Sequence, residues 1–224
     1  MYLFFTDQEL DQCVPYSIIS IPFVLQQLFL PFLGKKIDLT LWQVIKIILF
    51  FGSRISGESR PKTFGDLNTK SILDFYNSSD FRKAEVSSAG FQASAKGCAK
   101  LASVMSKKGQ SLMSEESWKK LHSKPKENIF GDLPDGRLRS NFTLGGLNYF
   151  DTGKFSSNPI EKMFYGNRDG FYGWFGLGGS IVQWNPELEI GFAFIPTYLD
   201  LTDLTNFRGS DLQQIVKDCA INCK

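Results

Sequence analysis

The apolar positions in the first third of the chain form two runs that prolines and polar residues interrupt. Residues 18–33 contain two prolines and two glutamines, and residues 39–51 contain Gln43 and Lys46. Both runs are shorter than the ~20 apolar residues that a membrane-spanning helix needs. They favour buried core helices, with a membrane-surface segment as the alternative. Residues 53–66 are rich in Ser, Gly, Arg and Pro and predict a solvated loop.

Hydrophobic spacing later in the chain predicts three helices. Small apolar residues recur at 95, 98, 99, 102 and 105 after Ser94, whose side chain can cap the helix. The alanines of this stripe would let the helix approach a sheet closely. Ser114 followed by two glutamates predicts a second, shorter helix with acids at the positive end of its dipole. The last helix is predicted over residues 210–219, where Leu212, Ile215, Val216 and Cys219 follow helical spacing.

From about Asn141 onward the pattern is typical of β-strands. Residues 171–175, 180–184 and 190–195 are rich in apolar and aromatic residues, and Asn185-Pro186 predicts a hairpin turn. Residues 171–195 should therefore form adjacent antiparallel strands. Helices before and after such a run indicate an α+β fold, in which helices flank an antiparallel sheet. We expect residues 1–70 to form an apolar helical segment and loop that pack on a domain of residues 71–224.

Composition excludes several classes of protein. The 25 Lys and Arg residues against 23 Asp and Glu residues leave a net charge of +2, so no nucleic-acid partner is expected. Hydrophobic residues make up 42% of the chain, which excludes intrinsic disorder. Residues 1–5 carry no basic residue and three acids follow by residue 11, unlike a secretory signal. Without such a signal a cytoplasmic location is the default expectation.

Cysteines and histidine limit the chemistry that the chain can offer. Cys13, Cys98, Cys219 and Cys223 are too scattered for a disulfide framework. With His122 as the single histidine, a zinc site would lack ligands, so neither a metal nor another cofactor is expected. Because lysines surround His122, we predict a solvated surface histidine rather than a catalytic base.

Two stretches resemble one known family. Residues 85–101 resemble a Pro-Ser-Gly-Gly segment that runs into a helix of the type Ser-Ala-x-Asp-Leu-Ala. Residues 173–186 resemble Gly-His-x-Gly-x-Gly-Gly-Ser followed by a strand, Asp-Pro and another strand. Together they resemble the β-lactamase-related, penicillin-binding-protein-like serine hydrolases. The segment 206–210, which leads to a last helix, is similar to their eukaryotic β-lactamase-domain-containing branch. The resemblance covers about residues 82–219.

This resemblance implies the C-terminal part of a β-lactamase/transpeptidase-like domain. The complete family domain hydrolyses esters, amides or peptides through a serine acyl-enzyme. Aligned on the glycines, Trp174 replaces the family's Lys or His, and Phe175 replaces its usual hydroxyl residue. An indole cannot titrate or carry charge. The substrate-binding residues that the resemblance implies are Trp174, Phe175, Gly176, Gly178, Gly179, Ser180, Ser87 and Ser88, and we expect Ser87 and Ser88 to lie near Trp174.

No catalytic residue is identified in the chain. The family's Ser-x-x-Lys nucleophile would lie far upstream, and the matches at Ser59, Ser117 and Ser123 fall in loops, surface segments or the wrong order. The leading hypothesis is a serine hydrolase relative without its nucleophile, binding a small ester, amide or peptide. The alternatives are an inactive pseudoenzyme that binds a ligand or partner, and a membrane-associated interaction protein acting through residues 15–51.

Overall fold

The structure is a computed structural model. It describes residues 17–18, 76–83, 91–130, 138–151, 153, 165–176, 178–199 and 206–223. Four helices lie in this part of the chain: α5 (Ser79–Lys83), α6 (Ala95–Ser106), α7 (Glu115–His122) and α9 (Phe207–Asn222).

The main sheet is a six-stranded antiparallel meander. In spatial and chain order its strands are β2 (Lys126–Phe130), β3 (Leu138–Phe142), β4 (Asn148–Tyr149), β5 (Tyr172–Phe175), β6 (Ile181–Asn185) and β7 (Ile190–Phe194). The predicted hairpin at Asn185 is the β6–β7 connection, and the predicted neighbours β5, β6 and β7 are antiparallel. Both predictions are confirmed, as is the α+β class.

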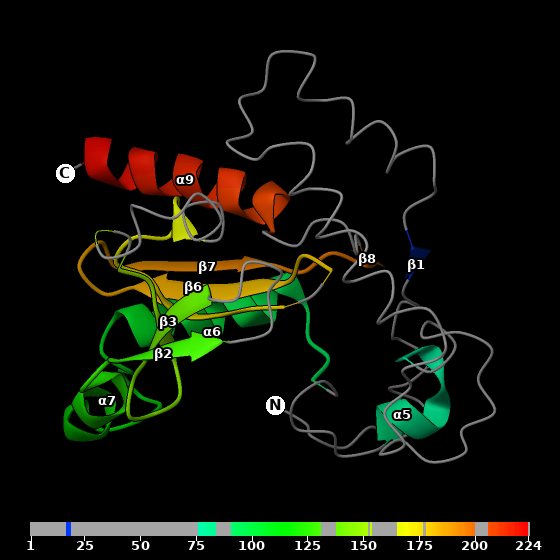
Figure 1. The fold of residues 1–224 in the computed structure, drawn as a ribbon, viewed down its shortest axis with the longest axis horizontal. Coiled ribbons are helices and arrows are strands. Elements are labelled where there is room, and N and C mark those ends of the chain that lie inside the picture. Colours follow the sequence, from blue (N-terminus) through cyan, green and yellow to red (C-terminus); the bar gives the residue numbers. More distant parts are fainter. Residues whose placement is uncertain are drawn as a thin grey trace.

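Helices cover both faces of this sheet. Figure 1 shows α9 along one face and α6 along the other, with α7 beside the β2–β3 end. The core on the α9 side contains Phe150, Tyr165, Phe171, Ile181, Ile190 and Phe192. The core on the α6 and α7 side contains Ala102, Met105 and Trp184, against which Trp118, Leu121 and Tyr172 pack. The sheet is therefore the middle of three layers.

Local signals explain where two of the helices begin. The Ser94 hydroxyl accepts a hydrogen bond from the Gly97 amide at 3.1 Å, which caps α6 as predicted. Ser114 does the same for α7 through the Ser117 amide at 3.2 Å. In α6, Ala102 is fully buried against β7, because Gly191 leaves room for the helix backbone. The predicted close approach of α6 to the sheet is confirmed.

The predicted last helix is present as α9, but its apolar stripe does not face the sheet. Leu212, Ile215 and Val216 are exposed, with 58% of Ile215 accessible to solvent. The buried positions of α9 are small or polar instead, and Gln213 is one of them. Its amide nitrogen donates to the amide oxygen of Gln183 on β6 at 2.9 Å. A polar contact therefore joins α9 to the sheet where apolar packing would be the usual arrangement.

One short pairing links the two ends of the chain. Strand β1 (Ser17–Ile18) pairs in parallel with β8 (Tyr198–Leu199). The rest of the apolar runs, the 53–66 loop and the boundary near residue 70 lie outside the described residues, so the two-part organisation stays a prediction. Among the helices that the structure describes, none has the length and apolar character needed to cross a membrane.

Candidate functional site

The predicted glycine motif forms the turn between β5 and β6. The Gly176 amide donates to the Ser180 carbonyl at 2.8 Å, and the Gly179 amide donates to the Gly176 carbonyl at 3.2 Å. Gly178 and Gly179 have φ angles of 90° and 111°, which side chains rarely adopt. The turn thus requires glycine at these two positions, and the amides of Gly176 and Gly179 already donate hydrogen bonds within the turn.

The start of α9 fixes this turn from the other side. The Asn206 side-chain amide donates to the Gly176 carbonyl at 2.8 Å. The Arg208 guanidinium donates to the Gly178 carbonyl at 3.2 Å. A β-carbon on Gly179 would stand 2.8 Å from the same guanidinium. Segments thirty residues apart are therefore joined by hydrogen bonds at this point.

Trp174 is the exposed feature of this region. It lies opposite Val182 of β6, one residue beyond the two-residue ladder between β4 and β5. The indole is 53% exposed and stacks on Phe142 of β3, with ring centroids 5.8 Å apart and an interplanar angle of 26°. The ring of the neighbouring Phe175, which packs against the core on the α9 side, has its centroid 6.4 Å from that of the indole, with an interplanar angle of 19°. We call these three rings the Trp174 platform.

The platform offers stacking and apolar contact rather than acid–base chemistry. Its only polar side-chain group is the indole N–H, which donates one hydrogen bond and cannot titrate. Behind it, the buried Arg168 guanidinium lies 4.9 Å from the Phe175 ring centroid and donates to the Asn206 carbonyl at 3.5 Å. This cation supports the platform from inside the core.

Only some of the serines considered in the sequence belong to the described residues. Ser59, Ser87 and Ser88 lie outside them, so the proximity of Ser87 and Ser88 to Trp174 stays a prediction. Ser117 is exposed in the first turn of α7, where its hydroxyl accepts from the Ser114 hydroxyl at 2.9 Å. The Ser123 hydroxyl donates to the Lys120 carbonyl at 2.8 Å. These two hydroxyls make hydrogen bonds at the two ends of α7, and neither hydrogen bond is to a side chain that could act as a general base.

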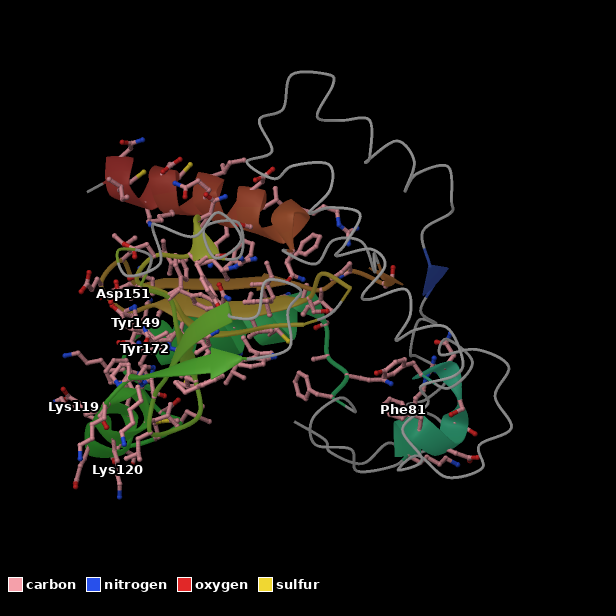
Figure 2. All side chains as sticks on the ribbon, viewed as in Figure 1. Phe81, Lys119, Lys120, Tyr149, Asp151 and Tyr172 are labelled. Carbon is pink, nitrogen blue, oxygen red and sulfur yellow. The ribbon has the colours of Figure 1, made fainter. Side chains whose placement is uncertain are left out.

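The prediction of a solvated His122 is wrong. The side chain is only 7% exposed and lies between α7 and the sheet. The Trp184 indole N–H donates to its Nε2 at 2.8 Å, and its Nδ1 lies 2.8 Å from the Trp118 carbonyl. Because Trp118 and His122 are four residues apart, one helix face carries both toward the sheet. Figure 2 shows Lys119 and Lys120 projecting from α7 toward solvent. The flanking lysines concealed this pattern in the sequence.

Two tyrosines extend the same aromatic cluster. Tyr172 of β5 meets the His122 ring edge-on at 4.7 Å and stacks on Tyr149 of β4 at 4.5 Å. Burial, with smaller contributions from Tyr149 and Glu187, raises the pKa of Tyr172 to about 12. The phenol therefore stays protonated near neutral pH and cannot act as a base there. Figure 2 shows Tyr149, Tyr172 and Asp151 at the same end of the sheet.

The described residues hold no group of three or more His, Cys, Asp or Glu side chains placed to bind a metal ion. Cys98 is buried, and burial raises the pKa of its thiol, whereas Cys219 and Cys223 are exposed on α9. No protein-family model, curated protein or solved structure matches this chain.

Proposed function

We propose that this chain is a ligand-binding, non-hydrolysing relative of the β-lactamase-related serine hydrolases. The ligand is a small ester, amide or carboxylate with an apolar or planar group that stacks on the Trp174 platform. The observation that carries the proposal is the half-exposed indole of Trp174, held against Phe142 at the strand position where the resembled family has Lys or His.

The shape of the platform supports binding of modest strength. An aromatic pair contributes about 0.5–1.5 kcal/mol beyond the burial of its surface. Stacking on the Phe142 ring already restricts the indole, so less side-chain freedom remains to be lost on binding. With one stacking ring and no charged anchor, we expect a dissociation constant on the order of millimolar, which corresponds to about −4 kcal/mol.

The same residues argue against acyl transfer. A serine hydroxyl becomes a useful nucleophile only when a base lies within hydrogen-bond reach. The lone pair on Nε2 of His122 is used by the Trp184 indole, and Trp174 cannot accept a proton. Ser117 and Ser123 make hydrogen bonds within and at the end of α7. The proposal therefore predicts binding without turnover.

Two measurements on the full chain test this proposal. A fluorophosphonate probe should label no serine, and benzylpenicillin should bind without being hydrolysed, as followed by ligand-observed NMR. Trp174→Ala should abolish the binding signal and Trp174→Phe should keep it. Ile215→Ala, a change at an equally exposed apolar residue on α9, is the matched control and should bind like the unmodified chain.

Two results would contradict the proposal. Stoichiometric labelling of one serine, lost when that serine becomes alanine, would restore the hydrolase hypothesis. Unchanged benzylpenicillin binding in Trp174→Ala would remove the platform from the site. Because about half of Trp174 is exposed, its loss should lower the free energy of unfolding by about 1–3 kcal/mol, which is less than the stability of a typical domain, so misfolding would not mimic loss of binding.

A further inference from the structure

The hydrogen bonds of His122 fix its protonation state. An indole N–H can only donate, so the contact from Trp184 Nε1 requires a lone pair on Nε2 of His122. The proton of the neutral ring must then sit on Nδ1, from which it donates to the Trp118 carbonyl at 2.8 Å. Protonation of Nε2 would place two donors face to face at 2.8 Å inside a buried cluster, and this contact would break.

Within this cluster, His122 is the group that can take up a proton as the pH falls below neutrality. Burial lowers its pKa, while the hydrogen bond to the Trp118 carbonyl opposes that effect in part. The phenol of Tyr172, which faces it from β5, and that of Tyr149 behind it both have raised pKa values and stay neutral. The charged side chains that act on these two phenols are the carboxylates of Asp151, Asp169 and Glu187. On α7 itself, Lys119 and Lys120 are exposed and turned away from the ring.

The C-terminal end of α7 is joined to the strand that carries Phe142. The Leu144 amide donates to the Ser123 carbonyl at 2.9 Å, and the Gly145 amide donates to the Leu121 carbonyl at 3.0 Å. These amides belong to the 143–147 turn, which begins directly after Phe142. The neutral ring of His122 thus holds α7, and through α7 the turn next to the Trp174 platform.

We propose that His122 is a protonation-sensitive lock, and that its protonation releases the end of α7 and the 143–147 turn and so weakens ligand binding at the Trp174 platform. The effect on binding rests on the function proposed above. The lock itself rests on the hydrogen bonds of His122 alone. His122 takes up one proton on opening, so the equilibrium constant for opening rises by at most about tenfold for each unit by which the pH falls.

The lock is tested on the full, tag-free chain without ligand. His122 is the only histidine of the chain, so the imidazole resonances in an NMR spectrum belong to it and report its titration directly. We expect it to titrate below the ordinary histidine pKa. Hydrogen exchange at the Leu144 and Gly145 amides, corrected for the intrinsic exchange rates, gives the equilibrium constant for opening of the turn. This constant should rise by up to about tenfold for each unit by which the pH falls. The α6 amides, whose helix is bonded to Trp118 rather than His122, should change far less.

Two variants make the test specific. In His122→Gln the side-chain oxygen can still accept from Trp184 without titrating, so exchange at the turn should lose its pH dependence. If that variant does not fold, Trp184→Phe removes the opposing donor, and the pKa of His122 should rise toward its ordinary value. Equal acceleration in α6 and in the turn, or pH dependence that survives in His122→Gln, would overturn the lock.

A ligand arm separates the lock from the proposed function. Benzylpenicillin binding should be weaker at a pH below the measured pKa of His122 than at pH 7 in the unmodified chain, and it should be equal at these two pH values in His122→Gln. Opening of the turn with unchanged binding would overturn the link to the platform. Absence of binding at both pH values, with the turn still opening, would overturn the proposed function and the link while the lock stands.

Discussion

The contact between β7 and α6 gives the sharpest prediction for stability, because no side chain fits at Gly191. A β-carbon there would stand 2.5 Å from the carbonyl carbon of Ala102 and from the Cα of Ser103, where ordinary contact begins at 3.4 Å. The atoms in the way are backbone, and the nearest of them is the Ser103 nitrogen, so α6 would have to retreat by about 1.3 Å. A gap of only about 0.5–1 Å already forfeits a quarter to a half of the dispersion energy across an interface.

We therefore expect Gly191→Ala to lower the free energy of unfolding by about 3 kcal/mol, at the upper end of the range for overpacked cores. That loss is a large share of the 5–15 kcal/mol that stabilises a typical domain. Urea unfolding followed by tryptophan fluorescence measures it, since Trp184 lies in the same core. Gly176→Ala is the control: its β-carbon would lie 3.9 Å from Ser180, and it should be neutral or stabilising by up to ~1 kcal/mol. A Gly191→Ala variant within 0.5 kcal/mol of the unmodified chain would refute the direct contact between helix and strand.

Three further changes test other parts of the fold by the same urea assay. Gln183→Leu or Gln213→Leu alone should lower the free energy of unfolding by about 1–3 kcal/mol, because the remaining buried amide is left unpaired. The double change should be nearly neutral, and a double change that costs the sum of the two single ones would contradict the pairing. Ser94→Ala should cost about 1 kcal/mol through loss of the α6 cap, and no change would show that the cap is not needed. Because the pKa of folded His122 is lowered, the unfolded chain binds the proton first as the pH falls below about 6.5. Stability should be complete above that pH and fall by up to about 1.4 kcal/mol per unit until the folded pKa is reached, and in His122→Gln this dependence should vanish.

Much of the fold could be predicted from interactions between residues that are close in the sequence. Ser94 predicted the start of α6 because a hydroxyl at that position satisfies a free amide, and this needs no knowledge of the rest of the chain. The β6–β7 hairpin was equally local, since the Asn185 side chain accepts from the Glu187 and Leu188 amides at 2.9 and 3.0 Å. Such contacts span a few residues, so the sequence displays them directly.

The features that the sequence did not reveal depend on distant partners. His122 looks solvated beside its lysines, and only Trp184, sixty-two residues away, makes it a buried acceptor. In α9 the apolar stripe predicted the helix but not its orientation, because Gln213 faces the sheet to meet Gln183. The Trp174 position was identified from the glycine pattern, yet its stacking on Phe142 follows from strand pairing that no local signal encodes.

One cross-strand row explains why the His122 cluster lies where it does. Tyr149, Tyr172, Trp184 and Gly191 stand opposite one another on β4, β5, β6 and β7. Residues directly opposite share a face of the sheet, so this row meets α6 and α7. At the Gly191 end the row has no side chain, and α6 rests on the strand backbone. On β6, β5 and β4 the row carries aromatic rings, and the Trp118 and His122 rings of α7 pack against this aromatic layer. A side chain that fills this layer must be flat and must accept the indole N–H of Trp184, and a neutral imidazole does both. The change from a glycine on β7 to aromatic rings on β6, β5 and β4 thus brings α6 close to the sheet and also creates a buried, titratable position beneath α7.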